Sequence, residues 1–219
     1  MEMTTAEIKI INLTKKYGDK TVFENFNLTL EKNRITVILG ESGSGKTTLV
    51  NVLCGFTDYD GTVRGADEKF SVVFQKDCLI PNLTVMGNLR LVNPAVVNDD
   101  LKKVGLEGCG NMYIKELSAG MARRVAVLRA LLYDAPALFA DEPFVNIDLA
   151  NKFAIIKEIR NAQTVKPKTI VCVTHDVKEA VMLADRVIVL KNGAIIFDDV
   201  NRGDETEKTL YGILSKKSD

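Results

Sequence analysis

The residues best suited to chemistry form one glycine-rich segment that runs from Gly40 to Thr48. Glycines let the backbone turn so that successive N–H groups point at a single anion. Lys46 can reach the β- and γ-phosphates of a nucleotide, and the Thr47 hydroxyl can ligate magnesium. This spacing predicts a bound nucleoside triphosphate. The residues expected to contact it are Gly40, Ser42, Gly43, Ser44, Gly45, Lys46, Thr47 and Thr48.

The elements on either side of this segment decide whether it is a phosphate loop or an ordinary turn. The apolar run Arg34–Leu39 before it predicts a buried strand, and Thr47–Leu53 after it predicts a helix. The helix N-terminus would add a partial positive charge beside the phosphates. A turn that only joins a strand to a helix is the alternative, and the filled motif positions disfavour it.

Two acids and one histidine follow other apolar runs. Asp141 and Glu142 end the run that begins at Ala137, and His175 ends the run that begins at Thr169. The carboxyl ends of parallel strands are where such sheets bind ligands. We therefore expect Asp141 to hold the hydrated magnesium ion, Glu142 to polarise the attacking water, and His175 to contact the γ-phosphate.

The hydrophobic pattern predicts an α/β fold in one domain of 219 residues. The runs that begin at Arg34, Ala137 and Thr169 are apolar almost throughout, which is typical of parallel strands covered on both faces. Helical spacing is expected over Asp99–Leu106, Ser118–Tyr133 and Asp204–Lys217. Eight strands are predicted, at Glu7–Leu13, Val22–Leu30, Arg34–Leu39, Phe70–Phe74, Ala137–Ala140, Thr169–Thr174, Arg186–Leu190 and Ala194–Phe197.

Composition narrows the range of partners. Lysine plus arginine and aspartate plus glutamate each total 29, so no basic excess favours nucleic-acid binding. The four cysteines form no C-x-x-C pair, which favours reduced thiols in a cytosolic protein. No window approaches the ~18 apolar residues of a membrane span. Any role at a membrane is therefore expected to be indirect.

With these residues in place, the chain resembles the nucleotide-binding subunit of an ATP-binding cassette (ABC) transporter, from about Ile8 to Gly193. The resemblance implies ATP and Mg²⁺ as ligands. Tyr17 matches the aromatic residue on which the family stacks adenine. Gln75 matches the family's glutamine that senses magnesium and water. The resemblance thus implies a catalytic set of Glu142, His175, Gln75 and Lys46, with Thr47, Gln75 and Asp141 at the metal.

The segment Leu117-Ser-Ala-Gly-Met121 resembles the family's Leu-Ser-Gly-Gly-Gln signature. Ser118 and Gly120 lie at a predicted helix N-terminus, where they could present donors to the γ-phosphate of an ATP held by another subunit. One complete site would then need two chains. Ala119 replaces the first glycine of the family's pair, and Met121 replaces its glutamine.

The resemblance also implies an architecture and partners. The implied fold is a P-loop NTPase core with a mostly parallel sheet, an antiparallel β subdomain and an inserted α-helical subdomain. The core would comprise residues 1–75 and 134–219, and the helical subdomain residues 76–133. The implied partners are an integral-membrane permease, a second ATPase subunit in a homodimer and a solute-binding protein. The chain would lie on the inner face of the cell membrane.

The motifs favour an importer of small solutes, most like the taurine, sulfonate and nitrate group. Phe144 after Asp-Glu-Pro is typical of such importers, whereas Asn146 is typical of cassettes that export lipoproteins or macrolides. An export cassette is therefore one alternative. A soluble, non-transport ABC ATPase is another, although this chain lacks the paired cassettes and basic extensions of such proteins. A weakly active subunit of an unequal pair is a third, suggested by Ala119 and Met121.

Overall fold

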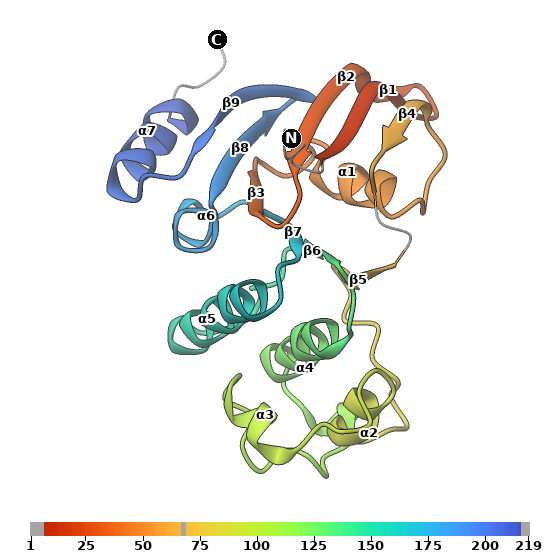
Figure 1. The fold of residues 1–219 in the computed structure, drawn as a ribbon, viewed down its shortest axis with the longest axis vertical. Helices are drawn as coiled ribbons and strands as arrows, with labels where there is room; N and C mark the ends of the chain where they lie inside the picture. Colours follow the sequence, from red (N-terminus) through yellow and green to blue (C-terminus); the bar gives the residue numbers. More distant parts are fainter. Residues whose placement is uncertain (1–6, 67–68, 216–219) are drawn as a thin grey trace, which may run out of the picture. The chain divides into compact units, whose positions relative to one another are not determined.

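The computed structural model describes residues 7–66 and 69–215, which fall into two compact units. Unit 1 takes its residues from 1–68 and 169–219, and unit 2 comprises residues 69–168. Figure 1 labels the elements of both units. Mixed sheets and helices confirm the predicted α/β class. The predicted division into core and helical subdomain stays a prediction.

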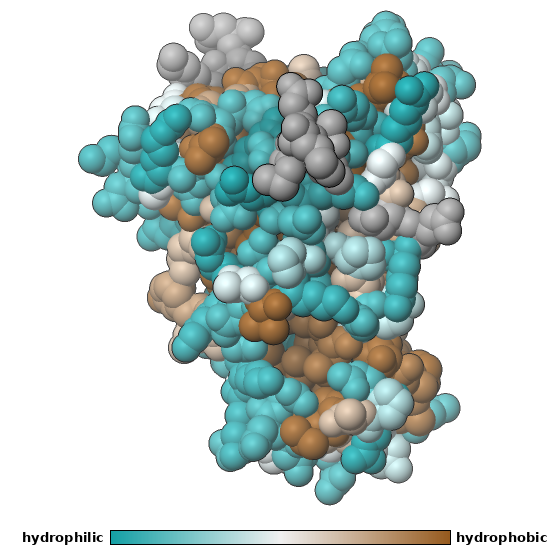
Figure 2. Space-filling view, in the orientation of Figure 1, coloured by the Kyte–Doolittle hydropathy of each residue, from teal (hydrophilic) through white to brown (hydrophobic). Residues whose placement is uncertain are grey.

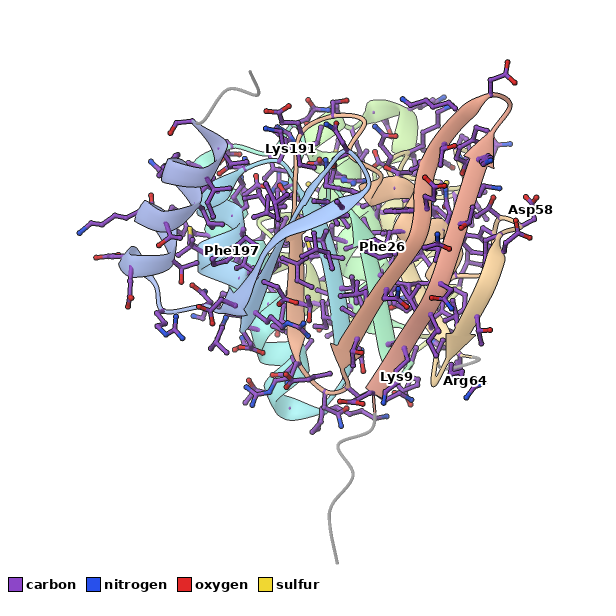
Figure 3. The ribbon with its side chains drawn as sticks, turned by 90° about the horizontal axis from the view of Figure 1, so that it is seen from above. Lys9, Phe26, Asp58, Arg64, Lys191 and Phe197 are labelled. Atoms are coloured by element: carbon purple, nitrogen blue, oxygen red, sulfur yellow. The ribbon has the colours of Figure 1, made fainter. Side chains whose placement is uncertain are left out.

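Unit 1 contains two sheets. In the first, β1 (Glu7–Tyr17) pairs antiparallel with both β2 (Lys20–Glu31) and β4 (Asp60–Arg64). Figure 3 shows these strands side by side, with Lys9 and Arg64 in register at one end of the sheet and Phe26 directed into the interior. The expected antiparallel β subdomain is therefore present. The strand β4 was not predicted, because Val63 is its only apolar residue.

The second sheet of unit 1 carries the predicted nucleotide-binding loop. Its central strand β3 (Ile35–Leu39) runs parallel to β7 (Thr169–Thr174) and to β8 (Arg186–Lys191). The strand β9 (Ala194–Val200) pairs antiparallel with β8. Every residue of β3 and β7 is buried, which confirms the interpretation of these apolar runs as covered parallel strands. The helices of unit 1 are α1 (Lys46–Leu53), α6 (Val177–Leu183) and α7 (Asp204–Leu214).

Unit 2 combines a parallel strand pair with helices. Its strands are β5 (Phe70–Val73) and β6 (Ala137–Asp141), paired so that Val73 faces Ala140. All eight predicted strands are thus present in the molecule. The helices of unit 2 are α2 (Val85–Arg90), α3 (Asn98–Lys102), a 3₁₀ turn η1 (Ile114–Glu116), α4 (Ala119–Leu132) and α5 (Leu149–Val165).

The structure differs from two expectations for the helices and contains one further short helix. The helix expected over Asp99–Leu106 is α3, which ends at Lys102, because Gly105 adopts a φ of +66° and turns the chain. The helix expected over Asp204–Lys217 ends at Leu214, and residues 216 and 217 lie outside the described part. The short helix α2 was not predicted, although Thr84 caps it by accepting a hydrogen bond from the Gly87 N–H.

Within residues 7–66 and 69–215, no helix has both the length and the apolar character needed to cross a bilayer.

Candidate functional site

The glycine-rich segment of unit 1 forms the expected strand-loop-helix between β3 and α1. Gly43 and Gly45 have φ angles of +84° and +107°, a conformation that other residues rarely adopt. Gly40 has no room for a side chain, because an added Cβ would lie 2.5 Å from the Leu190 carbonyl oxygen. Gly45 caps α1 without a side-chain hydrogen bond, so no capping side chain competes for the first N–H groups of the helix. This backbone can receive an anion.

The polar side chains of the loop have the character that phosphates require. Lys46 Nζ lies 2.7 Å from the Gly40 carbonyl oxygen and 2.9 Å from that of Glu41, so it folds back across the loop. Among the described residues, no group forms a hydrogen bond with the buried Ser44 Oγ. Thr47, in the first turn of α1, is exposed. A buried cation and an unsatisfied buried hydroxyl beside a helix N-terminus fit a polyphosphate.

Tyr17, the expected adenine contact, ends β1 and is 48% exposed. Lys15 Nζ lies 4.6 Å from the centre of the Tyr17 ring, within the range of a cation–π interaction. The same ammonium donates a hydrogen bond to Asp58 Oδ1 at 2.9 Å and thereby lowers the pKa of that carboxyl. Lys15 therefore contacts the Tyr17 ring within unit 1, and the exposed part of the ring remains accessible to an adenine base.

His175 follows β7 directly and is exposed. The Gly40 N–H donates to the Thr174 carbonyl oxygen at 3.3 Å, so the chain just before His175 is tied to the start of the phosphate loop. On the other side, Asp176 caps α6 by accepting hydrogen bonds from the N–H groups of Lys178 and Glu179. The structure thus places His175 at the same sheet edge as the loop, as its position after a strand suggested.

The acid pair lies in unit 2, at the end of β6. Asp141 is 4% exposed, whereas Glu142 is partly exposed and has a φ of +49°. A left-handed conformation costs a residue other than glycine on the order of 1–3 kcal/mol, and such strain is concentrated at functional sites. Because β5 runs parallel to β6, Gln75 after β5 lies at the same edge as the two acids. The structure therefore brings Gln75, Asp141 and Glu142 together.

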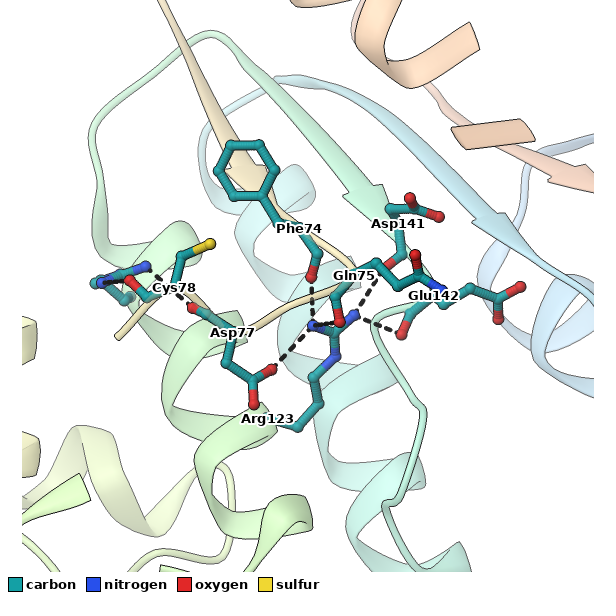
Figure 4. A network of polar contacts seen from close by, with 8 residues as sticks. Phe74, Gln75, Asp77, Cys78, Arg123, Asp141 and Glu142 are labelled. Atoms are coloured by element: carbon teal, nitrogen blue, oxygen red, sulfur yellow. Dashed lines mark hydrogen bonds and ion pairs between the residues drawn. The ribbon is translucent and has the colours of Figure 1, made fainter. Parts of the chain in front are cut away.

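One side chain that sequence reasoning missed connects these three positions. Arg123 of α4 is 3% exposed and hydrogen-bonds to the backbone after both strands (Figure 4). Its position within the signature helix suggested only a helical residue. The sequence held no signal for this role, because the burial of Arg123 and its distant partners appear only in the structure.

The signature segment begins α4 as predicted. Ser118 is the N-cap, and its Oγ accepts a hydrogen bond from the Met121 N–H at 3.2 Å. Ala119 is exposed at the first helical position, so an alanine in place of the family's glycine fits there. Gly120 is different, because an added Cβ would lie 2.3 Å from the Asn146 carbonyl oxygen. The close approach of α4 to this loop therefore requires glycine at position 120.

We expect Gly120→Ala to lower the free energy of unfolding by about 1–3 kcal/mol, the usual cost of overpacking. The added methyl group must push α4 away from the backbone at Asn146. Denaturant unfolding would measure the change. Gly212→Ala is the matched control, because an added Cβ there meets nothing within 4 Å. In the interior of α7 this control should gain roughly 0.5–1 kcal/mol. Unchanged stability of Gly120→Ala would contradict the close approach.

The loop after Glu142 ends at Asp148, which caps α5. Its carboxylate accepts hydrogen bonds from the backbone N–H of Asn151, at 3.1 Å, and from the Asn151 side chain, at 2.6 Å. These bonds lower the pKa of Asp148. Asn151 Oδ1 also accepts a hydrogen bond from Arg124 of α4 at 3.0 Å. The loop is therefore linked to the signature helix at both ends.

The expected site residues thus form two sets. Unit 1 carries Tyr17, the phosphate loop and His175, and unit 2 carries Gln75, Asp141, Glu142, Ser118 and Gly120. Each set has the local geometry described above. Their joint action on one nucleotide stays a prediction.

Comparison with known proteins identifies the family. The model of the ABC transporter family matches residues 23–145, which is more than half of the chain. The chain belongs to the ABC transporter family. This confirms the predicted family, its α/β P-loop fold, and the assignment of the chain as a transport ATPase. The match spans the phosphate loop, the signature helix and the acid pair.

The relatives match over most of their length. The chain is 36% identical over 203 residues to an aliphatic sulfonates import ATP-binding protein, SsuB 2, of Rhodococcus jostii (strain RHA1). That alignment covers 89% of this chain and 83% of the relative. It is 34% identical over 204 residues to the taurine import ATP-binding protein TauB of Escherichia coli (strain K12), with 85% of this chain and 80% of the relative covered.

Solved structures of a related cassette agree with the fold. The dimeric bacterial ABC transporter cassette MJ0796 has a TM-score of 0.78 and is 30% identical, with 90% of this chain and 99% of that chain covered. A post-hydrolysis state of the same cassette bound to ADP and Pi has a TM-score of 0.77 at 29% identity.

Proposed function

We propose that this ABC ATPase powers a small-solute importer by binding and hydrolysing ATP, and that the solute is an aliphatic sulfonate or a similar small anion. The observation that carries the proposal is the match, along 83% and 80% of the relatives' length, to subunits named for sulfonate and taurine import. The phosphate loop of unit 1 supports the ATP step, because its geometry suits a polyphosphate.

Each set of residues has a role in this proposal. Lys46, Ser44 and the loop N–H groups hold the phosphates, and Tyr17 stacks on adenine. Thr47, Gln75 and Asp141 hold Mg²⁺, which when bound neutralises charge on the phosphate oxygens. Glu142 accepts a proton from the attacking water, and His175 contacts the γ-phosphate. Asp141 is almost fully buried, as expected of a carboxylate that holds a cation rather than one that is solvated.

Two copies of the chain work together in this proposal. Ser118 and Gly120 at the start of α4 donate to the γ-phosphate of an ATP held by the other copy. Nucleotide binding then favours the closed pair by mass action, because only that state contacts both nucleotides fully. The dimeric form of the related cassette MJ0796 supports a homodimer. Hydrolysis removes the preference and lets the pair reopen.

A separate permease receives this motion, and unit 2 offers a surface for it. A hollow of about 390 Å³ opens beside α2, lined by residues that include Met86, Arg90, Val97 and Asn111. Figure 2 shows hydrophobic residues gathered over the part of unit 2 near β5 and α4. Exposed apolar surface of this kind is typical of protein interfaces. A permease that spans the membrane would hold the chain on the inner face as a peripheral subunit, with a solute-binding protein on the other side.

Asn88 organises the segment that leads into this hollow. It is fully buried, its Oδ1 accepts from the Ile80 N–H at 2.8 Å, and its Nδ2 donates to the carbonyl oxygens of Ile80 and Thr84, each at 3.1 Å. The segment between β5 and α2 is therefore held in one shape. A preformed surface loses less conformational entropy on docking.

Two measurements test the proposed function. We expect purified Glu142→Gln to double its mass in light scattering when magnesium and ATP are added, and to remain a monomer with ADP. Deletion of the gene in the source organism should abolish uptake of radiolabelled taurine or of a short alkanesulfonate. A molecular mass that does not change when ATP is added would contradict ATP-driven pairing of two copies. Unchanged uptake of both solutes would contradict the proposed substrate class.

A further inference from the structure

Arg123 has the most extensive set of side-chain contacts near the acid pair, yet the proposed reaction gives it no role. The residue lies in α4, five positions after the N-cap Ser118, and is 3% exposed. Its guanidinium contacts the segments that follow both strands of unit 2 (Figure 4). These segments carry Gln75 and Glu142.

The first set of contacts holds the backbone at the end of β6. Arg123 Nη2 donates to the carbonyl oxygens of Asp141 and Glu142, each at 2.6 Å. Both peptide planes are therefore oriented by one nitrogen. Figure 4 shows the carboxylates of Asp141 and Glu142 turned away from the guanidinium. The left-handed backbone of Glu142 is fixed through its carbonyl, and its carboxylate is directed elsewhere.

The second set holds the segment after β5. Arg123 Nη1 donates to the Phe74 carbonyl oxygen and to Asp77 Oδ1 at 3.0 Å, and the Gln75 carbonyl oxygen lies 3.5 Å away. The Asp77 carboxylate balances the buried positive charge. The position and orientation of the backbone that carries Gln75 therefore depend on the same guanidinium.

Arginine is suited to this position for a geometric reason. Its guanidinium is planar and rigid, and it carries two terminal nitrogens that face different directions. One nitrogen serves the end of β6 and the other serves the end of β5. A lysine ammonium has three donors at a single point, so it could hold one of the two segments well but not both.

We propose that Arg123 is a positioning residue that sets the backbone of Gln75 and of Glu142 together, and that it transmits movements of the signature helix α4 to both. This inference rests on the proposed ATP hydrolysis by Glu142. A shift of α4 must move the guanidinium, because Arg123 lies less than two turns from the start of that helix. The segments after β5 and β6 then move as one.

Hydrogen–deuterium exchange of the nucleotide-free chain tests the structural part. In Arg123→Gln we expect amides in both segments, 74–78 and 141–147, to exchange roughly tenfold faster, because the shared anchor is lost. Arg129→Gln is the matched control on the same helix. Among the described residues, Arg129 donates only to the carbonyl oxygens of Cys78 and Asp77, so its loss should affect residues 77 and 78. This measurement needs no ATP, so its result does not depend on the proposed function.

Steady-state ATP hydrolysis tests the functional part. Arg123→Gln should lower kcat by about 10- to 100-fold, the scale of a misplaced catalytic group, with the KM for ATP changed less than threefold. Arg123→Lys should recover part of the lost kcat, and Arg129→Gln should keep kcat within about threefold of the parent. If thermal unfolding shows that Arg123→Gln does not fold, Arg123→Lys is measured in the same way. Amides in both segments are again expected to exchange faster than in the parent.

Several results would overturn the proposal. One is unchanged exchange in either segment of the folded variant. Another is faster exchange without any loss of kcat. An equal loss of kcat in Arg129→Gln would show that anchoring of the 77–78 segment, and not Arg123, sets the rate. A parent chain that hydrolyses no ATP would contradict the proposed function while leaving the exchange result as a test of the shared anchor.

Discussion

Glu142→Gln should bind ATP as tightly as the parent chain and hydrolyse it at least ~100-fold more slowly, the usual scale for the loss of a general base. The amide keeps the size of the carboxylate but cannot accept a proton from water. Glu142 is partly exposed at the end of β6, and its backbone is held by Arg123, so the substitution should leave the local structure intact. Equilibrium binding of ATP and steady-state phosphate release would measure the two effects separately.

A second glutamate in unit 2 gives the matched control. Glu107 is exposed and pairs only loosely with Lys102 at 3.6 Å, so Glu107→Gln should keep both binding and turnover. If Glu142→Gln turned over ATP at the parent rate, another group would have to activate the water. Loss of ATP binding in Glu142→Gln would instead indicate that this carboxylate supports the nucleotide site itself.

Lys46→Ala should weaken ATP binding by about 10- to 100-fold, the equivalent of one or two charge-assisted hydrogen bonds. The ammonium already lies inside the loop, 2.7 Å from the Gly40 carbonyl oxygen, where the phosphates are expected. Its removal takes away both a cation and a contact that shapes the loop. Isothermal titration with ATP would measure the affinity. Thermal unfolding would show whether the stability of the whole fold has also changed.

An exposed lysine serves as the control for this second prediction. Lys208 lies on α7, and Lys208→Ala should bind ATP with the parent affinity. Parent-like affinity of Lys46→Ala would contradict the role of the segment as a phosphate loop. An equal loss of affinity in both variants would indicate that the binding responds to net charge rather than to a specific contact.

Local sequence determined the elements that position the site. The apolar runs around β3, β6 and β7 could be recognised because strands covered on both faces need apolar residues at every position. The phosphate loop could be recognised because its glycines and lysine must occur at fixed spacing. By contrast, β4 and α2 were missed because both are short. The strand β4 is also mostly exposed, so its stability comes from its neighbours more than from its own pattern.

The sequence by itself thus determined the family, the fold class and the candidate catalytic residues, because these depend on residue types at short spacing. Tertiary structure alone decided which backbone groups these residues meet. Nothing in the sequence indicated that Arg123 would bind the carbonyl oxygens of both Asp141 and Phe74, since those partners lie 18 and 49 positions away along the chain. Nor did it reveal that Gly120 lies against the Asn146 backbone. Such contacts arise only when strands and helices pack together, and a local pattern carries no record of them.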